Sequence, residues 1–301
     1  MPKILITGAS GFLGSTLVPH LLRLHHSLTT IGITDTDNIH CNLASSIPNI
    51  DTNFDWVIHA AGKAHVVPSN SNAIAEFYQV NLEGTKNLLK GLEETDKLPK
   101  AIVFISTVAV YGIESGTNIT EEYPLLGNSP YALSKIQAEE YLKIWCLKNN
   151  VKLSILRPSL IAGKKAPGNL GAMISGIKTG KYFRVGNGLA QKSILMAEDI
   201  GNLIPKLVEI GGIYNVCDNH HPSFAELDEL IANQLNKKAP MSIPYFAAKS
   251  LALIGDLVGN KFPINSGKLY KIVQSLTFSN EKAKRELDWE PLDVLQNFQI
   301  K

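Results

Sequence analysis

The chain has few cysteines, little net charge and no long apolar run, and each absence narrows what it can be. Its three cysteines, Cys41, Cys146 and Cys217, are scattered, without metal-site spacing or an even disulfide framework. We therefore expect a protein of the reducing cytoplasm with no metal site. The net charge of +2 gives no reason to expect nucleic acid as a partner. The first apolar run is too short for a signal peptide.

No segment reaches the roughly 18 uninterrupted apolar residues that a membrane-spanning helix needs. Residues 246–258 come nearest, but Lys249 and Asp256 interrupt them. The prediction for this segment is an amphipathic helix packed on the rest of the protein. Contact with a membrane surface is the alternative.

What the chain does contain is an alternation of short branched apolar runs with segments of helical periodicity. The pattern predicts strands at residues 3–7, 28–33, 55–59, 101–106 and 153–157, and helices near 12–24, 73–95 and 130–149. Strands that alternate with helices indicate a doubly wound parallel sheet, so the predicted fold class is α/β of the Rossmann type. The 301 residues are enough to bury a large core in one or two domains.

A glycine-rich turn follows the first predicted strand and opens a helical segment, with Gly8, Gly11 and Gly14 spaced G-x-x-G-x-x-G. Strand, glycine turn and helix form the context of a dinucleotide site. Gly8 permits the tight turn, Gly11 lets the backbone approach a pyrophosphate, and Gly14 lets the helix lie close to the strand. The helix N-terminus then offers free N–H groups to the phosphates. A strand–helix turn without a ligand is the alternative.

Tyr131 and Lys135 are four residues apart in a predicted helix, so they lie on one face about one turn from each other. An ammonium near a phenol favours the phenolate, and the pKa of Tyr131 is therefore expected to fall from its usual value of about 10. Such a phenol can take a proton from a sugar hydroxyl or return one to a carbonyl. An exposed helix face without chemistry is the alternative, because this spacing often arises by chance.

Two hydroxyl residues, Ser106 and Thr107, end the predicted strand 101–106. Ligands of open α/β sheets bind at the carboxyl ends of the strands, so these hydroxyls are expected at the crevice. Thr107 can share the proton of Tyr131 and hold a substrate oxygen. A helix cap after the strand is the alternative.

Together these segments resemble the extended short-chain dehydrogenase/reductases of the nucleotide-sugar epimerase/dehydratase family, over nearly the whole chain. The matching segments are residues 7–14, 55–62, 80–85 and 156–159, with Thr107, Tyr131 and Lys135 on the catalytic triad. The resemblance implies that Tyr131 is the catalytic acid/base and that Thr107 bonds the reacting sugar oxygen. It also implies that Lys135 lowers the pKa of Tyr131 and holds the nicotinamide ribose.

A nicotinamide dinucleotide is the cofactor that the resemblance implies. The residues expected to bind it are Gly8, Ser10, Gly11, Phe12, Leu13, Gly14, Asp35, Asn42, Leu43, Ala60, Ala61, Gly62, Asn81, Ser106, Tyr131, Lys135 and Pro158. NAD enzymes usually carry an acid at the end of the second strand. Gapless alignment puts Gly32 there, and a short insertion would put Asp35 there. Since no lysine or arginine follows nearby for a 2′-phosphate, NAD is predicted, and NADP stays open.

The residues after Thr107 help to decide which type of reaction the chain catalyses. Dehydratases of the family carry an Asp-Glu pair there, whereas this chain has Val108 and Ala109, which cannot move a proton. The resemblance therefore favours a 4-epimerase of a UDP-hexose or UDP-N-acetylhexosamine, acting through a 4-keto intermediate. One alternative is an NAD(P)H-dependent reductase of a 4-keto-6-deoxy nucleotide sugar for surface polysaccharides. A non-catalytic dinucleotide-binding protein is the alternative of another class.

Residues 161–301 resemble mainly the family's smaller substrate-binding part, of α/β type, and residues 1–160 its NAD-binding domain, to which the chain returns near 194–210. The residues predicted to contact a nucleotide-sugar substrate are Lys63, Asn169, Arg184 and Lys192, with His65 beside them. Surface charges and a structural histidine are the alternatives. The resemblance also implies a homodimer, through a four-helix contact that includes residues 73–95 and 130–149.

Overall fold

The structure is a computed structural model that describes residues 1–64, 66–259, 262 and 264–300. His65, which was predicted near the substrate, lies outside the described residues. Within the described ranges, no helix is long and apolar enough to cross a membrane.

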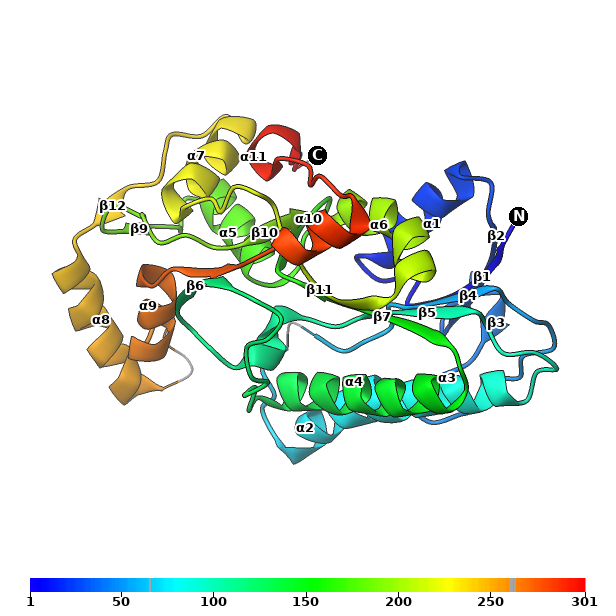
Figure 1. The fold of residues 1–301 in the computed structure, drawn as a ribbon. Coiled ribbons are helices and arrows are strands. Elements are labelled where there is room, and N and C mark those ends of the chain that lie inside the picture. Colours follow the sequence, from blue (N-terminus) through cyan, green and yellow to red (C-terminus); the bar gives the residue numbers. More distant parts are fainter. Residues whose placement is uncertain (65, 260–261, 263, 301) are drawn as a thin grey trace.

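Seven parallel strands form the central sheet, in the order β11-β7-β5-β4-β1-β2-β3 (Figure 1). They are β1 (Lys3–Thr7), β2 (Ser27–Gly32), β3 (Ile39–His40), β4 (Trp56–His59), β5 (Ala101–Ile105), β7 (Lys152–Pro158) and β11 (Gly212–Val216). The predicted doubly wound fold is confirmed, and β3 and β11 extend the sheet beyond the five predicted strands. The strand order reverses between β1 and β4, and sheets of this kind bind ligands outside the strand ends at that point.

Helices cover both faces of the sheet (Figure 1). One face carries α1 (Gly14–Arg23), α6 (Ala197–Ile210) and α10 (Glu281–Leu287), and the other carries α3 (Gly84–Glu93) and α4 (Pro130–Lys148). Successive residues of a strand point to opposite faces. Ile4 and Ile6 therefore join the core beneath α1 and α6, while Leu5 joins the core beneath α3 and α4.

The predicted helix 73–95 is interrupted in the structure. It consists of α2 (Ser71–Tyr78), a π-helical segment (Gln79–Glu83) and α3. Single π turns inside α-helices are rare and occur often at functional sites. This one contains Asn81, whose side chain is buried under the strand ends.

The remaining elements lie beyond the carboxyl ends of the strands (Figure 1). The helices are α5 (Gly168–Thr179), α7 (Phe224–Gln234), α8 (Tyr245–Val258), α9 (Ser266–Val273) and α11 (Val294–Asn297). The strands form three parallel pairs, β8 (Leu160–Ala162) with β10 (Ile194–Met196), β9 (Arg184–Val185) with β12 (Ser242–Ile243), and β6 (Gly116–Ile119) with β13 (Leu276–Phe278). The division into a cofactor domain and a substrate domain stays a prediction.

Candidate active site

The glycine turn between β1 and α1 has the geometry of a phosphate-binding loop. Gly8 has φ +75°, and a Cβ atom there would lie 2.6 Å from the backbone nitrogen of Ala61. A Cβ atom on Gly14 would lie 2.6 Å from the Ala9 carbonyl, so α1 begins directly against the turn. No side chain caps the start of α1, and its first turn holds no acid. Its N-terminal dipole therefore favours an anion.

A buried hydrogen-bond chain fixes the two central strands at this turn. The Thr85 hydroxyl donates to the Asn81 carbonyl at 2.7 Å, so it accepts from Nε2 of His59 at 2.8 Å. Nδ1 of His59 is then an acceptor for the Thr7 hydroxyl at 2.7 Å, and Thr7 in turn accepts from the Ala61 amide at 3.1 Å. Burial, and secondly the Lys135 charge, lower the pKa of His59 to about 3. This neutral histidine holds the Ala60–Gly62 turn at the end of β4.

Asn81 supports the same turn from below. Its Oδ1 accepts from the Lys63 amide at 2.7 Å, and its Nδ2 donates to the Lys63 carbonyl and to the Ser134 hydroxyl. Ser134 continues the chain by donating to the Tyr131 carbonyl at 2.8 Å. The amide group of Asn81 is thus engaged by protein atoms and positions the turn and α4, and its contact with the cofactor stays a prediction.

Thr107 and Tyr131 meet at the carboxyl end of β5. Thr107 precedes a short 3-10 helix (Val108–Tyr111), and its Oγ1 accepts from the Ala109 amide at 3.1 Å. Burial raises the pKa of the Tyr131 phenol, and a hydrogen bond with the Thr107 hydroxyl opposes part of that rise. The predicted contact of the two hydroxyls is present. The predicted fall of the Tyr131 pKa is wrong in this structure, because desolvation disfavours the phenolate.

Lys135 points to the Ala60–Gly62 turn. Its ammonium donates to the Ile105 carbonyl at 2.9 Å and lies 4.6 Å above the centre of the Phe104 ring. A Cβ atom on Gly62 would lie 3.0 Å from Nζ, so a larger residue there would crowd this ammonium. Burial lowers the pKa of Lys135 to about 8, against the opposing charge of Glu139. The prediction that Lys135 lowers the Tyr131 pKa has no counterpart in the structure, where the Lys135 charge is not among the causes that set it.

Glu139, one helical turn after Lys135, was not predicted as a site residue. Its fully buried carboxylate accepts from Nε of Arg157 at 3.1 Å and from Nη2 at 2.6 Å. Ser106 donates to the same carboxylate, so its hydroxyl is engaged by protein here, and its role as a cofactor ligand stays a prediction. Arg157 also donates to the Tyr111 hydroxyl at 3.1 Å. The signal in the sequence was a glutamate on the Lys135 helix face followed by an arginine in the next strand.

A second residue that sequence reasoning missed is Asp37, next to the end of β2. Strand pairing of Thr7 with Ile31 places Gly32 beside Gly8, at the phosphate-binding turn. A Cβ atom on Gly32 would overlap the Asp37 carboxylate, which Thr34 holds through its amide at 3.0 Å and its hydroxyl at 2.7 Å. The predicted Asp35 is exposed instead. Asp37 therefore supplies the acid at the end of β2 that Gly32 cannot.

The other cofactor positions fit a dinucleotide along the strand ends. Asn42 and Leu43 follow β3, and Leu43 packs on Gly84 at the start of α3. At the end of β7, Pro158 is buried, and the buried hydroxyl of the next residue, Ser159, has no hydrogen-bond partner among the described residues. Together with the glycine turn and Gly62, this unpaired hydroxyl is compatible with a bound nicotinamide dinucleotide. Ser10, Phe12 and Leu13 lie in the turn itself.

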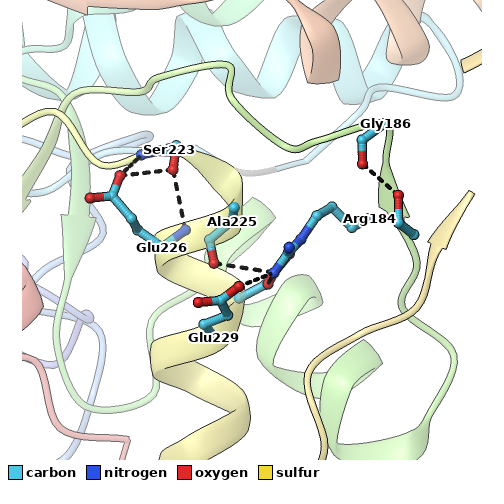
Figure 2. Close-up of polar contacts among 8 residues, drawn as sticks. Arg184, Gly186, Ser223, Ala225, Glu226 and Glu229 are labelled. Atoms are coloured by element: carbon cyan, nitrogen blue, oxygen red, sulfur yellow. Dashed lines mark hydrogen bonds and ion pairs between the residues drawn. The ribbon is translucent and has the colours of Figure 1, made fainter. Parts of the chain in front are cut away.

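Arg184 is committed to a structural ion pair, as Figure 2 shows. Its guanidinium reaches α7, where Nε donates to Asp228 at 3.0 Å and Nη2 donates to Glu229 at 2.9 Å and to the Ala225 carbonyl at 3.4 Å. The Asp228 carboxylate is fully buried. Releasing Arg184 would leave that carboxylate without its partner. The structure therefore gives no support to the binding of a diphosphate by Arg184, which stays a prediction.

The other predicted substrate residues differ in their surroundings. Lys63 forms an ion pair with Glu76 and lies 5.9 Å above the Phe77 ring centre. Asn169 is exposed in the first turn of α5. Lys192 is partly buried, and this burial lowers its pKa to about 8 against the opposing charge of Glu114, with a smaller lowering from Lys271. A bound anion would stabilise the charged form of Lys192, so of this set its surroundings fit an anion best.

Comparisons with known proteins identify the family. The family model described as the NAD dependent epimerase/dehydratase family matches residues 4–217. The chain is 28% identical to an N-acetyl-alpha-D-glucosaminyl-diphospho-ditrans,octacis-undecaprenol 4-epimerase of Escherichia coli O157:H7, over 93% of this chain and 88% of that protein. It is 26% identical to a UDP-glucose 4-epimerase of Vibrio cholerae, over 98% and 93% of the two chains.

The fold is also that of a solved relative. A UDP-glucose 4-epimerase with UDP-glucose from Thermotoga maritima superposes with a TM-score of 0.75 at 19% identity, over 98% of this chain and 95% of that one. The chain belongs to the NAD-dependent epimerase/dehydratase family. It is therefore an enzyme of the class that uses a nicotinamide dinucleotide on sugars activated by a diphosphate, and the predicted family, enzyme class and cofactor are confirmed.

Proposed function

We propose that the protein is an NAD-dependent 4-epimerase of a diphosphate-linked hexose or N-acetylhexosamine, with UDP as the first carrier to test. The contact of the Thr107 and Tyr131 hydroxyls at the end of β5 supports this proposal most directly, and Lys135 follows Tyr131 by one turn of α4 with its ammonium buried at the Ile105 carbonyl. The 3-10 helix after Thr107 begins with Val108 and Ala109. Their side chains cannot exchange protons, so this segment offers no acid for a dehydration.

The chemistry requires one proton and one hydride to leave the sugar and then return. The Tyr131 phenolate would remove the proton of the 4-hydroxyl, while the Thr107 hydroxyl holds the same oxygen. A bound nicotinamide dinucleotide would supply the acceptor for the C4 hydride and give it back. After the 4-keto sugar turns over in the pocket, Tyr131 would return the proton, and the configuration at C4 is inverted.

The resting structure favours a protonated Tyr131, because burial raises its pKa. A base at this position needs positive charge nearby. Lys135 has a buried ammonium and follows Tyr131 by one turn of α4. Glu139 raises the pKa of Lys135 and so helps to keep it charged. We expect Lys135 to act by holding the cofactor ribose and by stabilising the phenolate once substrate displaces water from the site.

The test is to incubate the purified protein with UDP-N-acetylglucosamine, without added cofactor, and to observe the C4 epimer by NMR. Conversion would establish an epimerase that retains NAD through its turnover. Absence of conversion would favour a reductase, which shares the triad but must exchange its cofactor. The next substrate would then be a 4-keto-6-deoxy nucleotide sugar with NAD(P)H.

A further inference from the structure

Helix α8 buries its small side chains and exposes its large apolar ones, which is the reverse of a packed amphipathic helix. It buries only small residues, Ala248, Ala252 and Gly255, which pack against α9 and the segment before it. Its large apolar side chains face outward, with exposed fractions of 73% for Phe246, 54% for Leu253, 48% for Ile254, 90% for Leu257 and 56% for Val258. The predicted packing of this helix on the rest of the protein is therefore made by its small residues, while its large apolar residues remain exposed.

These exposed side chains form one continuous face. Phe246, Leu253 and Leu257 are spaced by seven and four residues, which places them in one row along a helix. Ile254 widens this row by one position. The acid of the helix, Asp256, is engaged at its edge, where it accepts from the Ser266 amide at 3.0 Å and from the Ser266 hydroxyl. No carboxylate of α8 therefore competes for the apolar face.

The sequence segment that contains α8 carries a net positive charge. Residues 237–272 contain six lysines, one aspartate and no other charged residue, a net charge of +5 within a chain whose total is +2. Lys249 is exposed on α8 itself, and Lys237 and Lys238 are exposed just before β12. A second copy of the chain would bring an equal positive charge against this one. An anionic surface is complementary to it.

We propose that the exposed face of α8 docks on an anionic bilayer and presents the active site to a sugar carried on a membrane-embedded polyprenyl diphosphate. Apolar side chains on one face with lysines at its flanks are the combination that holds a helix in the interface of a membrane. The docking rests on the structure of α8. The choice of substrate rests on the proposed function.

One predicted substrate residue, Lys192, is linked to α8 through α9. α8 packs on α9, and α9 carries Lys271, whose charge acts on Lys192. The partly buried Lys192 is thus separated from the docking face by one helix. On this proposal a diphosphate bound at Lys192 would lie near the membrane surface, with its polyprenyl chain in the bilayer. Figure 1 shows α8 and α9 at the end of the molecule far from α1 and the N-terminus.

The first experiment measures vesicle binding of the full chain by flotation, at about 0.1 M salt, where the Debye length is about 10 Å. Wild-type protein is expected to float with vesicles of equal parts phosphatidylglycerol and phosphatidylcholine, and not with phosphatidylcholine alone. The double variant Leu253→Gln/Leu257→Gln is expected to lose at least ~10-fold in binding. The matched control is Leu22→Gln/Leu147→Gln, because these leucines are 52% and 86% exposed on other helices, against 54% and 90% on α8.

Three results would overturn the docking proposal. The first is no flotation of the wild type, and the second is an equal loss in the control variant. The third is a self-associated wild type, by sedimentation velocity, that the α8 variant alone makes monomeric, since a second copy would then cover the face. Circular dichroism and thermal melts of both variants establish that they remain folded.

A second measurement separates the docking from the chemistry. Turnover of an undecaprenyl-diphosphate N-acetylhexosamine in anionic vesicles is expected to fall at least ~10-fold in the α8 variant, with turnover of UDP-N-acetylglucosamine unchanged. Equal loss on both substrates would overturn the role of α8 in substrate access. Vesicle binding without turnover of either substrate would refute the proposed function and leave the docking face intact.

Discussion

Replacing Glu139 by glutamine tests the buried ion pair that lies under Lys135. The carboxylate is fully buried and accepts from Ser106 and from two nitrogens of Arg157, at 3.1 and 2.6 Å. Arg157 is itself only 2% exposed. Glutamine keeps the shape of the side chain but removes its charge, which leaves a guanidinium without a counter-ion in the interior.

Removing one partner of a buried pair usually destabilises a protein by about 3–5 kcal/mol. A loss of 1 kcal/mol lowers Tm by about 2–4 °C in domains of 150–250 residues, so Glu139→Gln should lower Tm by about 5 °C or more. Glu139 also raises the pKa of Lys135. Its loss should therefore move the alkaline limb of the kcat profile to lower pH, because Lys135 loses its proton earlier.

The assay is thermal and urea unfolding followed by circular dichroism and tryptophan fluorescence, together with a pH profile of kcat. The control is Lys143→Gln, since Lys143 lies 4.0 Å from the same carboxylate but is 40% exposed. An exposed pair contributes less than about 1 kcal/mol. The double variant Glu139→Leu/Arg157→Met should regain much of the lost stability, because no charge stays buried. Equal, small losses in Glu139→Gln and Lys143→Gln would refute the reasoning.

Three further predictions concern the site. Tyr131→Phe should lower kcat by more than ~10-fold while the affinity for NADH, measured by fluorescence, is unchanged; near-normal turnover would contradict its role as acid/base. Asp37→Ser should raise the affinity for NADPH relative to NADH by at least ~10-fold, because a carboxylate repels a 2′-phosphate, with Asp35→Ser as the control that leaves the ratio unchanged. Because the pKa of folded His59 is about 3, against 6.5 as a reference, its neutral form adds stability above pH 6.5 that is lost towards pH 3. His59→Gln should flatten the dependence of the free energy of unfolding on pH over that range. Urea titrations at several pH values measure this dependence, and an unchanged slope would contradict the prediction.

The order of the elements and the chemistry of the family were determined by the sequence alone. Local periodicity located the five strands β1, β2, β4, β5 and β7, because buried parallel strands are short branched apolar runs. The glycine turn and the Tyr131/Lys135 spacing are likewise local patterns, and they pointed to a dinucleotide enzyme. These features depend on neighbours in the chain, so they are visible without the fold.

The tertiary structure decided which polar groups remain free for a ligand. Ser106 and Arg184 have the residue types of ligands, yet each is engaged by a carboxylate 33 or more residues away, which no local pattern reveals. Asp37 reaches the end of β2 because the chain folds back after Thr34. The raised pKa of Tyr131 and the outward face of α8 also follow from burial, which is a property of the packed molecule. Sequence spacing predicts which side chains share a face of an element, but only packing decides whether that face meets protein, solvent or membrane.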